Sequence, residues 1–406
     1  MECRVAGDRA IVYGTARTNQ QADMNRAIST HARARWAVGA TFLLHGMLIG
    51  AWVPHIPLAK ERLDVGPAVF GLTLLAFAGG AITAMPMAGV LINRFGSARL
   101  TAITGVLFCL VFFGPILAPT IPVFVIAGFV MGMVMGSMDV AMNAHGIAVE
   151  KNLRLPTMSM FHGGFSVGGM VGAFLGAALL KFHGEVAQAV MTSAICLVIQ
   201  LIAMRFYLPA SSDKGLSGSH FVWPTRATIG LGLLCFLALM IEGSILDWAA
   251  IMMREKFLVD ASFAALSFGF YQGGMAISRL TGDWIRQWAG AVRMVTVSAL
   301  IAAAGTAVAL SVPSPYVAIA AFVFAGLGIG NVAPVLFAGG GRLEPDAPGR
   351  GIAAVSTLGY SGFLCGPPLI GFAAELTSLP TALFLTVIAA LIIAFYARTV
   401  NAADTY

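Results

Sequence analysis

Charge is scarce in this chain. Of its 406 residues, 58% are hydrophobic and only 10% are charged, whereas an ordinary soluble domain is about 25% charged. A soluble fold of this size could not cover its surface with so few charged side chains, but in a bilayer most of the outer surface faces lipid. The basic residues behind the net charge of +6 are dispersed between apolar runs. The positive balance therefore indicates membrane topology and not a nucleic-acid partner.

Cysteine pairs and catalytic motifs are scarce as well. Four of the five cysteines lie inside apolar runs and none forms a CxxC pair, so neither a disulfide framework nor a zinc site is predicted. The glycine-rich segment 161–169 lacks a Lys-Ser/Thr end, which argues against a phosphate-binding loop and an ATP-driven pump. We find no persuasive Ser-His-Asp, metal or paired-carboxylate constellation. We therefore expect no enzyme, no cofactor and no metal.

Long apolar runs are what the chain has instead. A helix needs about 20 apolar residues to cross the hydrocarbon core of a bilayer. Runs of this kind fall near 36–57, 68–92, 98–118, 121–146, 158–180, 187–208, 227–252, 262–285, 292–311, 315–338, 352–374 and 379–398. The sequence thus predicts an all-α membrane protein with twelve transmembrane helices.

A single long polar joint divides these runs into two sets. Residues 209–226 are Gly/Ser-rich and lie near the midpoint of the chain, so we interpret them as a linker between six-helix bundles at 36–208 and 227–398. Residues 1–35 and 399–406 are then tails.

The basic residues predict the orientation of the chain. Lys and Arg concentrate on the cytoplasmic side of membrane proteins. With the N-terminus inside, the outside keeps only Lys60, Arg62, Lys181, Arg254 and Lys256 of the 24 basic residues. We therefore expect both termini and the linker to be cytoplasmic, in a multi-pass protein of the bacterial inner membrane.

An internal repeat relates the two halves. When the second half is shifted by about 194 residues, the first two spans of each half align without a gap, a common feature of transporters. The register brings together the charged turns 60–62 and 254–256, the glycine pairs 79–80 and 273–274, and Gly96 with Gly290. The predicted bundles are therefore pseudo-symmetric.

The loop after the second predicted span resembles the signature of the major facilitator superfamily, G-x-x-x-D-R-x-G-R-R. Gly89, Arg94 and Gly96 match it in register, Asn93 replaces the Asp, and the terminal basic pair is reduced to a displaced Arg99. The resemblance implies two rocking six-helix bundles and a gating role for this loop. In the superfamily, the Asp of this signature caps a helix and forms an ion pair across the interface between the bundles. Asn93 can cap a helix but cannot form an ion pair, so the resemblance does not extend to this ion pair.

Several further segments resemble one bacterial subgroup of inner-membrane facilitators. They include GAWVPHIPLAKERLDVGPAVFG, MDVAMNAHGIAVEK, EGSILDWAA and GYSGFLCGPPLIGF. This subgroup includes membrane proteins associated with the metabolism of rhizopines, which are inositol-derived amines, such as MosC. The resemblance covers about residues 36–398 and implies transport of a small molecule.

Two carboxyl groups at membrane depth are our candidates for proton coupling. Glu242 lies near the middle of the seventh predicted span, and its repeat counterpart is Leu48, so the fold does not require it. A carboxyl in hydrocarbon favours its neutral form, which suits reversible protonation. Asp139 in the fourth span is the second candidate. The structural alternative for both is a carboxyl satisfied by a neighbouring helix or by water.

Further polar residues are candidates for a substrate cavity. Asp139 and Asn143 share one helix face, and so do His45 and Trp52 in the first span, which could bind a hydroxylated ring. Packing, interfacial anchoring or an interhelical hydrogen-bond network would explain these residues equally well. The remaining cavity candidates are His162, Asp247, Tyr271, Gln272, Asn331 and Tyr360.

Arg279 and Asp283 are four residues apart, a favourable spacing for an ion pair on a helix. They lie near the repeat of the signature loop, so an interdomain contact is favoured over substrate binding.

Together these features predict a monomeric secondary transporter in membrane lipid. It would move a small polar metabolite, such as a sugar, a polyol or an inositol-derived compound, by alternating access with protons. A drug or metabolite efflux antiporter is the alternative within transport, because the 20 methionines would tolerate apolar guests. A non-transporting receptor on the same fold is the alternative from another class.

Overall fold

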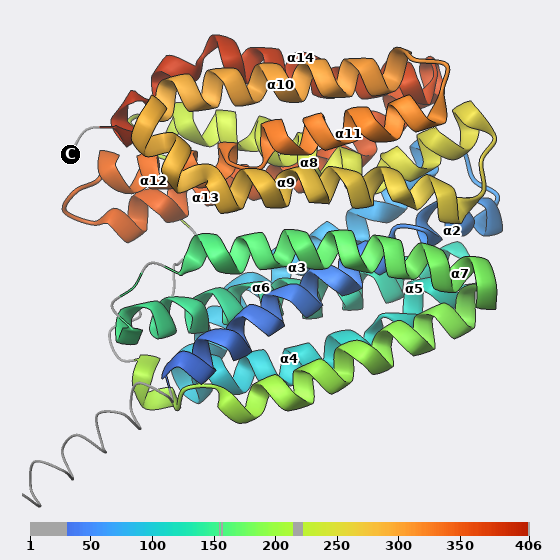
Figure 1. Ribbon diagram of the computed structural model, residues 1–406. Helices are drawn as coiled ribbons and strands as arrows, with labels where there is room; N and C mark the ends of the chain where they lie inside the picture. Colours follow the sequence, from blue (N-terminus) through green and yellow to red (C-terminus); the bar gives the residue numbers. More distant parts are fainter. Residues whose placement is uncertain (1–30, 154, 156, 214–221, 405–406) are drawn as a thin grey trace, which may run out of the picture.

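The computed structural model describes residues 31–153, 155, 157–213 and 222–404. Most of the expected N-terminal tail and residues 214–221 of the expected linker lie outside the described residues. The chain forms two layers of helices that lie against each other (Figure 1). The blue-to-green layer is the N-terminal half and the yellow-to-red layer is the C-terminal half.

The N-terminal half begins with a helix at His31–Trp52. It continues with α2 (His55–Leu63), α3 (Pro67–Phe95), α4 (Ser97–Val111), α5 (Phe113–Leu117), α6 (Ile121–Leu153), α7 (Met158–Ala203) and the short 3₁₀ helices η1 (Met204–Phe206) and η2 (Ala210–Asp213). Inside α7, Gly184 has φ 82° and ψ 175°, values that an α-helix does not adopt. This glycine therefore divides α7 into two helices.

The C-terminal half contains α8 (Ile229–Phe257), α9 (Ala261–Ala289), α10 (Ala291–Ser311), α11 (Pro315–Ile329), α12 (Val332–Leu343), α13 (Pro348–Leu376), α14 (Leu379–Phe395) and η3 (Ala397–Ala403). The α13 helix runs without interruption through Pro367 and Pro368. The tenth apolar run is broken between α11 and α12, at Gly330 and Asn331.

The two halves share the same turn between their second and third apolar runs. Gly96 has φ 86° and Gly290 has φ 77°, a left-handed region that favours glycine. The following helices are capped from outside the turn. The carboxylate of Asp213 accepts hydrogen bonds from Ser97 N at 2.7 Å and Ser97 Oγ at 2.7 Å. The carboxylate of Asp404 accepts from Ala291 N at 2.7 and 2.8 Å.

These caps fix the ends of the two halves. Asp213 lies within the expected linker, and its segment η2 packs on α4 and α6. The expected C-terminal tail is likewise structured up to Asp404, because Val400 and Ala403 of η3 are buried.

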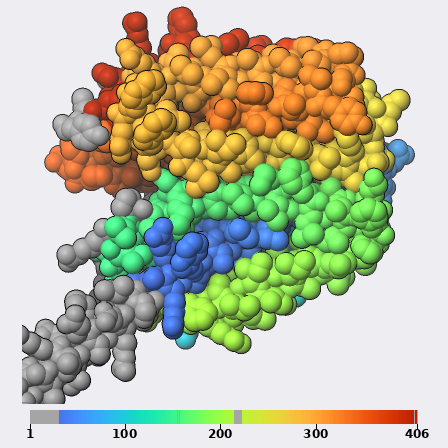
Figure 2. Space-filling view, viewed as in Figure 1, coloured from blue at the N-terminus to red at the C-terminus, as the bar shows by residue number. Residues whose placement is uncertain are grey.

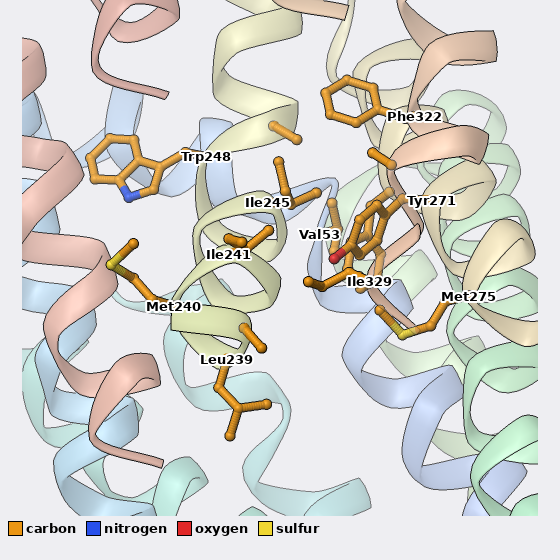
Figure 3. Packing of buried hydrophobic residues seen from close by; sticks show 14 of the residues in the cluster. Val53, Leu239, Met240, Ile241, Ile245, Trp248, Tyr271, Met275, Phe322 and Ile329 are labelled. Atoms are coloured by element: carbon orange, nitrogen blue, oxygen red, sulfur yellow. The ribbon is translucent and has the colours of Figure 1, made fainter. Parts of the chain in front are cut away.

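Contact between the halves is made mainly by α3 with α13 and by α7 with α9. The interior is apolar, and Figure 3 shows Trp248 and Tyr271 packed among aliphatic side chains. Outward-facing apolar side chains such as Val90, Ile126 and Phe395 are exposed, as expected of a surface that faces lipid.

Within the described residues, seven helices are long and apolar enough to cross a membrane, or eight if the bent pair His31–Trp52 and His55–Leu63 counts as one span. One of the seven is the divided helix that contains Gly184. The fold is therefore an all-helical membrane fold.

Candidate functional site

A cavity of about 320 Å³ lies between the two halves. Its lining comes from both: the first helix, α3, α6 and α7 on one side, and α8, α9, α12 and α13 on the other. The cavity contains eight of the residues predicted from the sequence, namely His45, Trp52, Asp139, His162, Glu242, Asp247, Gln272 and Tyr360.

The cavity also contains Arg279, which the sequence placed elsewhere. Its guanidinium Nη2 lies 3.5 Å from Glu242 Oε1, and its Nη1 donates to Ser166 Oγ of α7 at 2.8 Å. The side chains of Arg279 and Glu242 are only 11% and 15% exposed. The arginine therefore neutralises the most deeply placed carboxylate of α8 and joins the two halves inside the cavity.

The expected ion pair between Arg279 and Asp283 is replaced by two separate contacts. Arg279 is long enough to cross from α9 to α8, so it pairs with Glu242. Asp283 lies one turn further along α9, where Ser159 Oγ of α7 donates to its carboxylate at 2.6 Å. Both residues therefore contact the opposite half, but only Arg279 reaches the cavity.

Asp139 is held by its neighbours. Asn143 Nδ2 donates to Asp139 Oδ1 at 3.2 Å, and the hydroxyl of Tyr360 on α13 lies within hydrogen-bonding reach of the same carboxyl group. Asn143 thus supports the cavity without lining it. Asp139 and Tyr360 form a second polar contact between the two halves.

Asp247 differs from the other two cavity carboxyls. It lines the cavity, yet it has no hydrogen-bond or ion-pair partner among the described residues. Two further buried cavity atoms are unpartnered there, Gln272 Oε1 and His45 Nδ1. The cavity therefore presents free hydrogen-bonding capacity toward its interior.

Aromatic rings supply much of the remaining wall. The Trp52 and Phe77 ring centroids are 5.6 Å apart, and His45 lies 5.2 Å from the Phe108 ring centroid, edge to face. Phe42 contacts His162 at a centroid distance of 5.5 Å. These contacts hold the two histidines and Trp52 in fixed orientations, as expected of a preorganised pocket.

Besides Asn143, two more of the predicted cavity residues, Tyr271 and Asn331, lie outside the cavity. Tyr271 is fully buried in the core, where Figure 3 shows its side chain beside Val53 and Ile329. Asn331 lies at the break between α11 and α12, and its Nδ2 donates to the carbonyl oxygen and the hydroxyl of Ser278. Its amide therefore ties the break to α9, which is a structural role that its sequence position does not reveal.

The signature loop lies at the far end of the N-terminal half from α2. Asn93, Arg94 and Arg99 are exposed, and Gly89 lies with open space beside it. The cap of α4 comes from Asp213, as described above, and not from Asn93. Gly96 provides the left-handed turn that the signature requires.

The sequence missed a set of ion pairs at the opposite end, which we call the clasp: Lys60, Glu61, Arg254 and Glu255. Lys60 Nζ lies 2.9 Å from Glu255 Oε1, and Arg254 contacts Glu61 at 2.5 and 2.8 Å. Each charged turn therefore gives one cation and one anion to the other half. The repeat aligned these turns, but alignment does not show that they touch.

The third charged residue of each turn caps a helix within its own half. Arg62 donates to Ile116 O at 2.5 Å and Ala118 O at 3.5 Å. Lys256 donates to Leu310 O at 2.6 Å and to Val312 O at 2.7 Å. These carbonyl partners are related by the same shift of about 194 residues, so the pseudo-symmetry of the repeat extends to individual hydrogen bonds.

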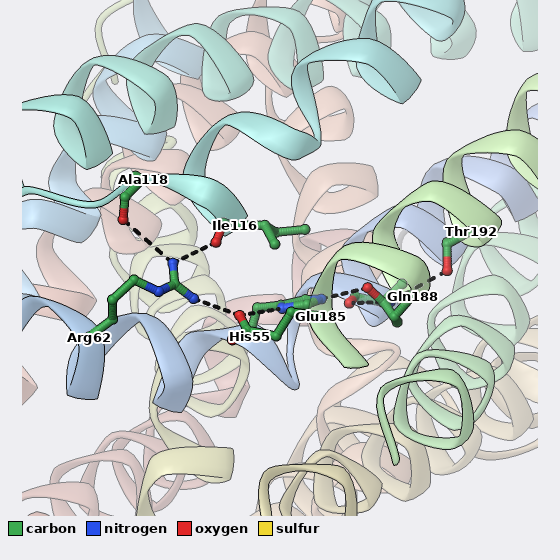
Figure 4. A network of polar contacts seen from close by, with 8 residues as sticks. His55, Arg62, Ile116, Ala118, Glu185, Gln188 and Thr192 are labelled. Atoms are coloured by element: carbon green, nitrogen blue, oxygen red, sulfur yellow. Dashed lines mark hydrogen bonds and ion pairs between the residues drawn. The ribbon is translucent and has the colours of Figure 1, made fainter. Parts of the chain in front are cut away.

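A polar network in the N-terminal half supports the clasp (Figure 4). Arg62 Nη2 lies 2.6 Å from Glu185 Oε2, and His55 contacts Glu185 at 3.4 Å and Gln188 at 2.5 Å. The hydrogen bond from His55 and the positive charge of Arg62 hold the pKa of Glu185 below its usual value of 4.5. The network therefore attaches α2 to the loop within α7.

Solved structures of membrane transporters share this two-layer helical fold. A bacterial homologue of the human lysosomal transporter Spinster, in an inward-facing and unoccupied conformation, matches with a TM-score of 0.71 at 14% identity over 93% of this chain and 99% of that chain. The Escherichia coli fucose:proton symporter FucP matches with a TM-score of 0.61 at 16% identity, over 91% and 98%.

The family follows from the sequence itself. The family model for the Major Facilitator Superfamily matches residues 38–339, so the chain belongs to this superfamily of membrane transporters and is not an enzyme. An uncharacterised MFS-type transporter of Yersinia pestis is 35% identical over 89% of this chain and 94% of that protein. The membrane protein MosC of Rhizobium meliloti is 29% identical over 88% of each, which confirms the subgroup resemblance.

Proposed function

We propose that this protein is a proton-coupled secondary transporter that moves a small metabolite by alternating access. The observation that carries the proposal is the ion pair between Glu242 and Arg279, buried in a cavity that both halves line. Protonation of Glu242 would release Arg279 from the ion pair. Because Arg279 also donates a hydrogen bond to Ser166 of the opposite half, protonation of Glu242 would change a contact between the halves.

Twelve spans in two bundles, with both termini in the cytoplasm of a bacterium, complete the proposal. The count of twelve is supported by the division of α7 at Gly184 and by treating each bent or broken pair of helices, at Pro54, Phe112 and Asn331, as one crossing. The distribution of Lys and Arg favours this orientation.

Rocking of the halves requires contacts that can open at each end. The clasp joins the halves at one end through exposed ion pairs, which contribute little stability and break readily. At the other end, Asp283 and Ser159 make an exposed hydrogen bond between the halves. The cavity lies between these two ends, as alternating access requires.

The substrate proposed from the sequence is a small hydroxylated metabolite, such as a sugar, a polyol or an inositol-derived compound. The similarity to FucP, a fucose:proton symporter, fits both this class and proton coupling. The cavity volume of about 320 Å³ is within the range of small-ligand sites.

A test begins with a thermal-shift screen of the purified protein against sugars, polyols and amines, because a ligand stabilises the fold by mass action. A compound that binds is then followed into proteoliposomes with an imposed pH gradient. We expect accumulation of this compound against its own gradient, and we expect Glu242→Gln to abolish accumulation while leaving exchange without a gradient intact. The matched control is Asp346→Asn, at an exposed position away from the cavity. Gradient-driven accumulation by Glu242→Gln at the wild-type rate would contradict the proposed coupling.

An efflux antiporter is the second candidate, favoured by the methionine and phenylalanine side chains of the lining, among them Met85, Met131 and Phe363. Flexible thioethers adapt to varied apolar guests. The sign of the proton flux separates the two candidates: a symporter alkalinises the side that loses substrate, whereas an antiporter acidifies it.

A further inference from the structure

The carboxyl groups outnumber the cations in the cavity. Asp139, Glu242 and Asp247 line it, against the single guanidinium of Arg279. Glu242 is paired with Arg279, and Asp139 is held by Asn143 and Tyr360. Asp247 is therefore the cavity carboxyl that has no partner among the described residues.

Burying an ionised carboxylate without a partner is costly. Asp247 lies on α8 one residue before Trp248, and Figure 3 shows the Trp248 side chain packed in the core. Trp248 is 0% exposed, whereas the Asp247 side chain lines the cavity. A bound cation would complete this site.

A second, independent feature points the same way. Gln272 is 2% exposed, lines the cavity, and its Oε1 has no hydrogen-bond partner in the described part of the chain. A carboxylate and an amide oxygen are both acceptors. The group that satisfies them must bring several hydrogen-bond donors.

The opposite wall suits an organic cation. By the internal repeat, Trp52 of the first helix is equivalent to Leu246 of α8, the residue before Asp247. Trp52, Phe77 and Phe268 all line the cavity. Aromatic faces attract ammonium groups, Trp most strongly, and they cover the carbon skeleton that carries the charge.

We propose that the substrate carries a protonated amino group, which Asp247 binds as its counter-ion with Gln272 as a second acceptor and the aromatic wall of Trp52 against its body. This inference rests on the proposed function and narrows its substrate class. It assigns Asp247 to substrate recognition and leaves Glu242 to proton coupling.

The test uses matched pairs of probes on the purified full-length protein in detergent. The hydroxylated pair is glucosamine with glucose, supplemented by N-acetylglucosamine, which keeps the ring and loses the charge. The apolar pair is phenethylamine with 2-phenylethanol. We expect the amine of at least one pair to bind at least about tenfold more tightly than its uncharged analogue, measured by calorimetry and thermal shift. The pair that responds identifies the body of the substrate as hydroxylated or apolar.

Variants of Asp247 test whether this residue causes the preference for an amine over its uncharged analogue. In Asp247→Asn the preference for the amine should fall by about tenfold while the weak affinity for the uncharged analogue is kept, which also shows that the variant is folded. Asp247→Glu should restore part of the preference.

Three results would overturn the inference: uncharged analogues that bind as well as the amines, an amine preference unchanged in Asp247→Asn, or stabilisation by Na⁺ alone with no response to any amine at millimolar concentration. The proposed function fails in a different way, namely if an amine binds as expected but is not transported into proteoliposomes. Gradient-driven uptake of a neutral sugar with no amine preference would contradict only this inference.

Discussion

The clasp and the cavity are built on the same repeated helices, but only the clasp keeps equivalent residues in both halves. At the clasp, residues 60–62 and 254–256 keep equivalent charges and make equivalent contacts. In the cavity, Glu242 and Arg279 stand where the first half has Leu48 and Met85.

This difference separates two tasks. Each half offers an equivalent charged turn, so the contacts between the halves at the clasp can be duplicated. In the proposed mechanism, one substrate and proton site lies between the halves and need not be duplicated. We therefore interpret the departures from symmetry as marks of the proposed functional chemistry.

Among these predictions, breaking the ion pair between Glu242 and Arg279 should have the largest effect on stability. Arg279→Gln leaves Glu242 buried without its cation, and removal of one partner from a buried pair costs about 3 kcal/mol or more. We expect a clear fall in the apparent melting temperature of the purified protein, measured at neutral pH by intrinsic fluorescence. The double variant Glu242→Gln/Arg279→Gln should recover much of the loss, because no uncompensated charge remains. A double variant less stable than Arg279→Gln would show that packing, and not charge, dominates at this site.

The two helix caps allow the symmetric part to be tested. Asp213→Ala and Asp404→Ala each remove the acceptor for the first backbone N–H of an equivalent helix, α4 or α10. We expect similar losses of about 1 kcal/mol each, measured as matched shifts in the same melting experiment. A loss confined to one of them would mean that the halves differ in stability at this end in spite of equivalent geometry.

Charge exchange at the clasp should have a smaller effect on stability and a larger one on conformation. Glu255 is 43% exposed and Lys60 is 17% exposed, so the pair contributes at most about 1 kcal/mol after solvent screening. Lys60→Glu should open this end, and Lys60→Glu/Glu255→Lys should close it again. Distances between spin labels on the two turns would report both changes. High salt should mimic the single variant, since the Debye length falls to about 3 Å at 1 M. Unaltered distances in Lys60→Glu would exclude the clasp as a determinant of conformation.

The all-helical membrane fold could be predicted from the sequence, because the lengths of the apolar runs and the internal repeat can be read directly from it. Glu242 could be singled out as a departure from the repeat, and it lines the cavity. The partner of Arg279 could not, because helical spacing pointed to Asp283, and only the distance between α8 and α9 shows that Glu242 is within reach. Tyr271 and Asn331 looked like cavity residues for a related reason: a polar side chain in an apolar run gives no sign of which neighbouring helix it faces.

The weakest expected effect concerns the network behind the clasp, and it tests whether the N-terminal half has a pH dependence that the other half lacks. The pKa of Glu185 is lowered by the hydrogen bond from His55 and by Arg62, so its ionised form stabilises the folded state. That contribution is present above the unfolded pKa of about 4.5 and is lost as the pH falls through the lower folded value.

Between pH 7 and pH 4, the wild-type protein should therefore lose slightly more thermal stability than Glu185→Gln, whose side chain does not titrate. In the repeat, Lys256 is equivalent to Arg62. Lys256 donates to backbone carbonyls and has no carboxylate partner in the part of the chain that the structure describes. Lys256→Met should for that reason leave the acid sensitivity unchanged, whereas equal acid sensitivity of wild type and Glu185→Gln would remove the network as its source.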